Sequence, residues 1–175
     1  MIALVGEGLL TGVALAWIRL RGLGVEAGDP MAGLGLGLGA AVLLALVNYA
    51  VLRLAPAIQP VRAIRRVYRE MLRPLFATVR PLEIVGVSLA AGVGEELLFR
   101  GAVQAEFGLA IASVLFGLAH IGGLSSVVFG LWVAVMGFGL GGLAHAAGGL
   151  LAPIMAHAAY DAMAISFIRW DASGP

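Results

Sequence analysis

The chain has 175 residues, of which 61% are hydrophobic and only 12% are charged, whereas an ordinary soluble domain is about half apolar and about a quarter charged. The few charges are clustered, and the apolar runs between them are roughly 18 to 24 residues long, enough to cross a bilayer as helices. No run alternates as a barrel strand does, so the sequence predicts an all-α, polytopic transmembrane helix bundle formed by one membrane domain, residues 1–175. Cysteine is absent, which excludes disulfides, thiol catalysis and cysteine-ligated zinc.

Two N-terminal spans are predicted within residues 1–52. The first covers about residues 1–18 and ends at Arg19 and Arg21; it lacks a basic leader and a small-residue cleavage site, so we interpret it as a retained span. The second runs from about 31 to 52 and opens with GLGLGLG. Its glycines recur four residues apart, which favours close approach of a neighbouring helix.

Residues 53–80 interrupt the apolar pattern. Seven arginines oppose a single acid, Glu70, and apolar residues are interleaved at helical spacing. This pattern is typical of an amphipathic helix on a membrane surface, and its arginine excess favours the cytoplasmic side. We expect membrane lipid as its partner and no nucleic acid.

Residues 81–168 are predicted to form the catalytic core bundle. We divide them into spans near 82–100, 106–120, 124–144 and 148–168, separated by glycine- or proline-containing breaks. Together with the N-terminal pair this makes about six spans. The G-x-G-x-x-G pattern at Gly137, Gly139 and Gly142 has no strand before it and is not a nucleotide loop.

Ionisable residues inside membrane spans are costly and usually functional. Apart from Glu7 and Glu83 near predicted helix ends, the set is Glu95, Glu96, Arg100, His120, His145, His157 and Asp161. Glu96 and Arg100 are four residues apart with the acid first, a favourable orientation for an ion pair. Glu95 lies about 100° further round the helix, so it is left free for proton chemistry.

Two chemistries remain open for these residues. A buried carboxylate beside an imidazole can activate water, and a second imidazole can stabilise the oxyanion formed at a carbonyl. Alternatively, Glu95, His120, His157 and Asp161 offer nitrogen and oxygen ligands to a divalent metal such as zinc. We favour the metal-independent chemistry by a narrow margin.

Three stretches together resemble a known family. GEELLFRG (94–101), FGLAH (116–120) and HAAYD (157–161) resemble the three ordered motifs of the CPBP family, which contains the Ras-converting CAAX prenyl proteases and Abi-type, bacteriocin-processing relatives. The resemblance covers about residues 85–165. It implies an intramembrane endopeptidase acting on a peptide or protein substrate reached from the bilayer.

The resemblance also implies roles for individual residues. Glu95 and His120 would activate the attacking water, His157 and Asp161 would line the other side of the scissile carbonyl, and Glu96, Arg100 and Phe116 would hold the shape of the site. Asp161 departs from the asparagine of the prenyl proteases. Because an ionised carboxylate can only accept hydrogen bonds, Asp161 would orient His157 or hold a metal rather than donate to an oxyanion.

Other functions remain as alternatives. A non-enzymatic membrane protein, such as an immunity or partner-regulating subunit, could retain the same scaffold; a transporter is disfavoured because the chain has no internal repeat. Ser125 and Ser126 only faintly resemble a rhomboid serine motif, and His145 belongs to no motif. We expect an integral protein of a bacterial or archaeal cell membrane, and the sequence leaves open the substrate, the oligomeric state and the membrane side on which the site opens.

Overall fold

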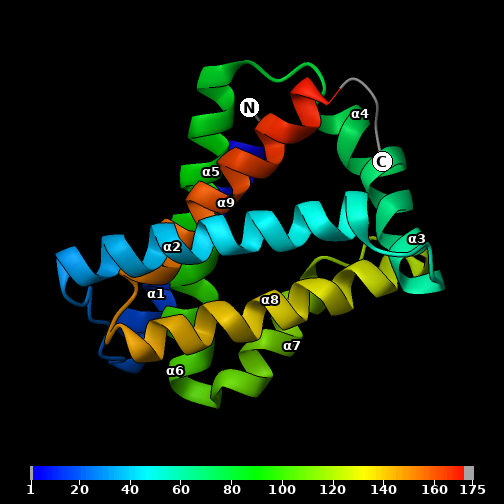
Figure 1. The fold of residues 1–175 in the computed structure, drawn as a ribbon. Helices are drawn as coiled ribbons and strands as arrows, with labels where there is room; N and C mark the ends of the chain where they lie inside the picture. The colour runs from blue at the N-terminus through cyan, green and yellow to red at the C-terminus, as the bar shows by residue number, and fades with distance from the viewer. Residues whose placement is uncertain (1, 172–175) are drawn as a thin grey trace.

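The computed structural model describes residues 2–171, and every regular element in that range is helical, as the sequence predicts (Figure 1). α-Helices alternate with short stretches of π-helix (η1–η3) and one 3₁₀ turn (η4). The elements are α1 (Ile2–Arg21), α2 (Pro30–Tyr49), η1 (Ala50–Leu54), α3 (Gln59–Val67), η2 (Tyr68–Leu72), α4 (Arg73–Phe76), α5 (Pro81–Glu96), η3 (Leu97–Val103), α6 (Gln104–Phe107), α7 (Leu109–Ala119), η4 (Leu124–Ser126), α8 (Val127–Ala146) and α9 (Leu151–Trp170).

Four helical stretches among the described residues are long and apolar enough to cross a membrane. They are Ala3–Arg21, Pro30–Leu54, Leu124–Ala146 and Leu151–Trp170. Many of their outward-facing leucines and valines are exposed, as expected for side chains that meet lipid. These helices correspond to the first, second, fifth and sixth spans expected from the sequence, and they make the chain an integral membrane protein.

The other two expected spans take different forms. Residues 82–100 fall in α5, which has 16 residues, and in the π-helix η3 that continues it. Residues 106–120 contain α7, which has 11 residues and is about 16 Å long, roughly half of the hydrocarbon thickness. The first of these two segments is thus part of one continuous helical stretch, residues 81–107, and only α7 is shorter than a full span.

Helices α2 and α9 pack against each other and run in the same general direction, crossing at an oblique angle in Figure 1. A Cβ atom built on Gly37 would lie 2.7 Å from the Met155 Cβ, and one built on Gly33 would lie 3.2 Å from the Leu151 Cβ. Gly35 and Gly39 face open space instead. Only one of the two glycine rows therefore serves helix contact, and it draws α9 against α2.

Small residues also bring the remaining core helices together. Gly92 of α5 lies against Ala158 of α9, and Gly94 lies against Glu7 and Thr11 of α1. Gly117 of α7 faces the backbone of α8. Such contacts let polar side chains from α5, α7 and α9 meet near the middle of the bundle.

Most of the Arg-rich segment folds as α3, η2 and α4, whose apolar side chains face the protein interior. Val61, Ile64, Val67 and Tyr68 are buried, and Ile64 and Tyr68 share a core cluster with Leu52 and with Ile168 of α9. Much of the apolar face that the sequence suggested for a membrane surface is therefore covered by the protein itself. Met71 and Leu75 of this segment remain exposed.

Candidate active site

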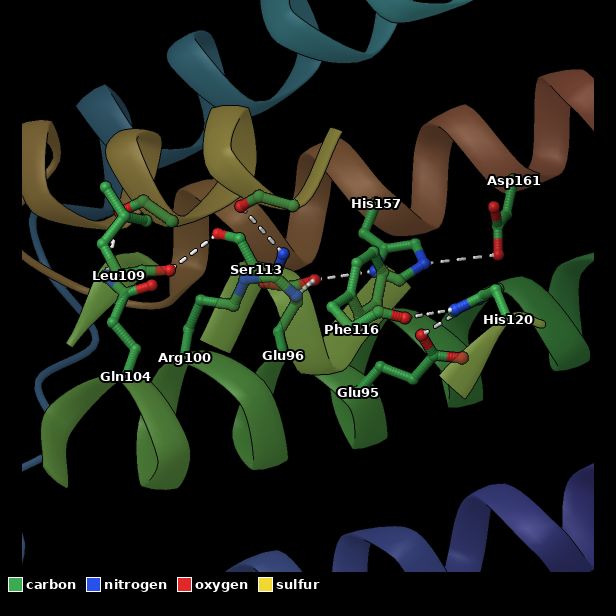
Figure 2. A network of polar contacts seen from close by, with 12 residues as sticks. Glu95, Glu96, Arg100, Gln104, Leu109, Ser113, Phe116, His120, His157 and Asp161 are labelled. Carbon is green, nitrogen blue, oxygen red and sulfur yellow. Dashed lines mark hydrogen bonds and ion pairs between the residues drawn. The ribbon is translucent and has the colours of Figure 1, made fainter. Parts of the chain in front are cut away.

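The two adjacent carboxylates lie at the point where α5 changes into the π-helix η3. Glu95 and Glu96 close α5, and Arg100 lies in the middle of η3 (Figure 2). π-Helical turns inside longer helices are rare and occur often at functional sites. The wider turn leaves Arg100 on the same face as Glu96.

Glu96 is the centre of a buried polar cluster. One of its carboxylate oxygens, Oε1, accepts a hydrogen bond from Arg100 Nη1 at 3.0 Å and lies 2.7 Å from His157 Nδ1 (Figure 2). The side chain of Glu96 is fully buried, and that of Arg100 is 1% exposed. Arg100 also donates to the Gly137 carbonyl at 3.1 Å, so the Glu96–Arg100 pair joins α5, η3, α8 and α9.

Phe116 of α7 contacts three of the charged or ionisable groups of the site. The guanidinium carbon of Arg100 lies 4.3 Å from its ring centroid, and the rings of His120 and His157 lie 4.8 Å and 5.9 Å away. A cation above an aromatic face is stabilised electrostatically, most strongly away from water. The Phe116 ring is therefore in contact with both histidines and with the guanidinium of Arg100.

His120 follows the last residue of α7 and approaches Glu95. Its Nδ1 donates to the Phe116 carbonyl at 2.8 Å, because a carbonyl oxygen can only accept. This bond directs Nε2 toward Glu95, whose Oε2 is 3.8 Å away (Figure 2). A water molecule can lie within hydrogen-bond distance of both atoms at once.

Asp161 lies one turn beyond His157 on α9. Its Oδ2 is 3.6 Å from His157 Nε2, while Nδ1 of the same ring faces Glu96. His157 therefore has a carboxylate on each side. The two carboxylates define the plane of the ring and the position of its protons.

A cavity of about 240 Å³ opens beside this cluster. His120, His157 and Asp161 line it together with apolar side chains from α2, η2, α8 and α9. Glu95 does not line it, but its Oε2 lies 3.8 Å from Nε2 of His120, which does. The cavity is thus largely apolar, with the ionisable groups gathered at one part of its wall.

The four side chains that the sequence offered as metal ligands do not converge on one point. No three His, Asp or Glu side chains among residues 2–171 converge as metal ligands. Nδ1 of His120 and of His157 are directed to Phe116 and Glu96, and their Nε2 atoms face different carboxylates, Glu95 and Asp161. The four residues that the sequence offered as zinc ligands form two separate pairs.

Two features of the site carry no sequence signal. His157 contacts Glu96, although the spacing argument assigned Glu96 to Arg100 alone; the partner is 61 positions away, and only packing brings it close. Glu7, set aside as a helix-end residue, lies against Gly94, and its Oε2 is buried without a hydrogen-bond partner among the described residues. The Oε2 of Glu95 also has no hydrogen-bond partner among the described residues. Because Gly94 precedes Glu95 in the chain, its contact with Glu7 brings a carboxylate of α1 to the edge of the site.

Two of the other residues that the sequence raised lie apart. Exposed His145 borders a second cavity of about 410 Å³, near the loops 22–29 and 147–150. Ser126 is buried, donates to the Gly123 carbonyl at 2.9 Å and accepts from the Gly122 amide at 3.0 Å. Those bonds stabilise the turn before α8, which gives Ser126 a structural role.

Comparison with known proteins places these residues in a family. Residues 77–163 match the family described as type II CAAX prenyl endopeptidase Rce1-like, and Glu95, His120, His157 and Asp161 all lie within the match. The chain is also 34% identical over 88 residues to the uncharacterized protein YpbD of Bacillus subtilis (strain 168); these residues are 50% of this chain and 47% of that protein. The chain thus spans about half the length of this curated relative, and no solved structure matches it. On the strength of the match over residues 77–163, the chain belongs to the CPBP family of CAAX-type, Rce1-like membrane endopeptidases.

Proposed function

We propose that this chain is an intramembrane endopeptidase in which Glu95 and His120 activate a water molecule. The observation that carries the proposal is the 3.8 Å approach of Glu95 Oε2 to His120 Nε2, with His120 fixed by its bond to the Phe116 carbonyl. A carboxylate and an imidazole in this arrangement share one water between them. Family membership supports peptide hydrolysis as the reaction they serve.

The reaction follows from these positions. The Glu95 carboxylate takes a proton from the water. At the same time the water oxygen attacks the scissile carbonyl carbon, and a tetrahedral oxyanion forms. His120 orients the water through Nε2. As the carbon–nitrogen bond breaks, the proton passes from Glu95 to the leaving amine, so the carboxylate returns to its starting state.

The remaining polar residues hold the reacting groups in place. Glu96, paired with Arg100, accepts a hydrogen bond from Nδ1–H of His157, so that Nε2 of the same ring is directed toward Asp161 and the cavity. Asp161 orients this ring and does not itself donate to the oxyanion. When the His157 ring is protonated between its two carboxylates, its Nε2–H donates a hydrogen bond to the oxyanion.

The substrate is an apolar peptide that reaches the cavity from the bilayer. The cavity wall is mostly apolar, and four helices expose leucine and valine side chains suited to lipid. CAAX peptides are the substrates expected at the family level, while Asp161 in place of asparagine favours a different or unprenylated peptide here. The Arg-rich segment, residues 53–80, lies on the cytoplasmic side and contacts lipid headgroups.

Cleavage by purified protein in lipid nanodiscs tests the proposal. The probes are a farnesylated CAAX peptide and an unprenylated peptide of leucine and alanine, with products identified by mass spectrometry. The wild-type protein should cut at least one probe, and Glu95→Gln and His120→Gln should each lower kcat by about 10²- to 10⁴-fold. His145→Gln, outside the site, is the matched control and should retain full activity.

Two outcomes would contradict the proposal. Full activity of Glu95→Gln would remove the carboxylate from the reaction. A well-folded wild-type protein that cuts neither probe would favour the alternative, a non-enzymatic membrane protein that keeps the family scaffold.

A further inference from the structure

Asn48 is a polar residue in an apolar helix that the proposed chemistry does not use. It is the chain's single asparagine and lies in the stretch Pro30–Leu54, where the residues around it are apolar. Leu44, Asn48 and Leu52 recur at helical spacing and line the same cavity as His120, His157 and Asp161. A polar side chain inside a membrane is costly to place, so its position on the cavity face indicates a use.

The packing of α2 against α9 fixes the depth of Asn48 relative to the site. Four pairs keep one register along the two helices: Gly33 with Leu151, Gly37 with Met155, Tyr49 with Phe167, and Arg53 with Asp171. The same register places Asn48 level with Ser166. Asp161 is five residues earlier on α9, about 7.5 Å along the axis at about 1.5 Å per residue.

The side chain of Asn48 has no hydrogen-bond partner among the described residues, a property it shares with Tyr160 and Trp132, while other polar groups of the cavity are engaged. Tyr68 donates to the Asp171 carboxylate at 3.1 Å, and burial together with this bond raises the pKa of Tyr68 to about 12. Nδ1 of His120 and Nδ1 of His157 are likewise engaged. Half-buried Asn48 lines this cavity and also a further one beside it, lined by Tyr49 and Phe167, and its amide donor and acceptor are both available there.

We propose that Asn48 binds the main chain of the substrate peptide, about two residues away from the bond that is cut. An asparagine amide matches a peptide group, because it offers one acceptor and two donors in a plane. The Asp161 carboxylate lies 3.6 Å from His157 Nε2, the proposed oxyanion donor, so Asp161 marks the level of the bond that is cut. An extended peptide advances about 3.3 Å per residue, so about 7.5 Å from that level corresponds to about two residues. The proposal rests on the proposed endopeptidase function and assigns a substrate-binding residue outside the segment that matches the family.

The test pairs a change in the enzyme with a change in the substrate backbone. In the farnesylated CAAX peptide and in the leucine–alanine peptide, each amide in turn is replaced by an ester, which removes one N–H and leaves the side chains unchanged. Wild-type protein should lose about 10-fold in kcat/KM at one ester position about two residues from the cut. Asn48→Leu, nearly the same size, should cut the all-amide peptides about 10-fold less well and lose nothing further at that position.

Controls separate binding from structure. Leu44→Ala removes an apolar side chain from the same cavity face and should retain the full ester penalty. Asn48→Leu should keep the wild-type Tm, since it places an apolar residue in an apolar helix. An equal ester penalty in wild type and Asn48→Leu would overturn the role of Asn48 while leaving the endopeptidase intact; a wild-type protein that cuts neither parent peptide would overturn both.

Discussion

Glu95 and Glu96 are neighbours in the chain but differ in what their oxygens contact. Glu96 is fully buried and joined to Arg100 and His157, whereas the side chain of Glu95 is 16% exposed and faces His120 across 3.8 Å. A carboxylate held by two partners stabilises structure, and one that faces an imidazole can move a proton. The change from α5 to η3 at this point gives the two side chains their different surroundings.

Substitution of the two glutamates should separate these roles. Glu96→Gln leaves the buried Arg100 without its counter-charge and should cost about 3–5 kcal/mol of stability, seen as a lower Tm and lower yield. Glu95→Gln should keep the Tm and lose turnover. Thermal unfolding in detergent and kcat on the same samples provide the measurement, and the reverse pattern would contradict the assignment.

Metal removal tests the second chemistry that the four site residues could support. Because these residues form two pairs rather than one ligand set, we expect a chelator to leave cleavage unchanged. Activity before and after dialysis against the chelator, with elemental analysis of the purified protein, measures this. One tightly bound zinc per chain whose loss abolishes cleavage would show that the metal chemistry is the correct one.

At the scale of elements, α2 and α9 position the site through their glycine contact. His157 and Asp161 lie on α9, and Gly33 and Gly37 allow α2 to approach that helix closely. The close approach brings Asn48 to the same cavity. The shape of the cavity therefore depends on Gly33 and Gly37, two glycines that do not line it and take no part in the proposed reaction.

Leucine substitution at two glycines of α2 should distinguish the contact face from the lipid face. Gly37→Leu puts a side chain where even a Cβ lies 2.7 Å from Met155, and it should cost about 1–3 kcal/mol or more of stability. Gly35→Leu, two residues away in open space, is the matched control and should be neutral or stabilising by up to about 1 kcal/mol. Thermal unfolding compares the two, and equal effects would argue against the packing.

The whole molecule has two distinct ends. Loops 22–29 and 147–150 meet at one end, where the Leu150 and Leu151 amides donate to the Glu26 and Ala27 carbonyls. The Arg-rich segment lies at the other end, where Tyr68 and Arg53 contact Asp171 beyond α9. The cavity reaches toward the Arg-rich end through Tyr68, Leu72 and Phe76.

Because the chain has no cysteine, single substitutions can report which end faces the cytoplasm. Arg62→Cys, in α3, should react with a membrane-impermeant maleimide only after the cells are permeabilised. Ala146→Cys, at the exposed end of α8, should react in intact cells. Labelling of Arg62→Cys in intact cells would place the Arg-rich segment outside.

The sequence alone determined the helical class, the family and the pairing of Glu96 with Arg100, because these depend on composition and on spacings within one helix. It did not determine the number of full spans, since α7 closes after 11 residues and only packing accommodates so short a helix. Nor could it predict that His157 contacts Glu96, that Glu7 lies against Gly94, or that Asn48 lines the cavity. Those relations join residues from separate helices, and the register of α9 against α2 and α5, set by small residues, is a property of the tertiary structure alone.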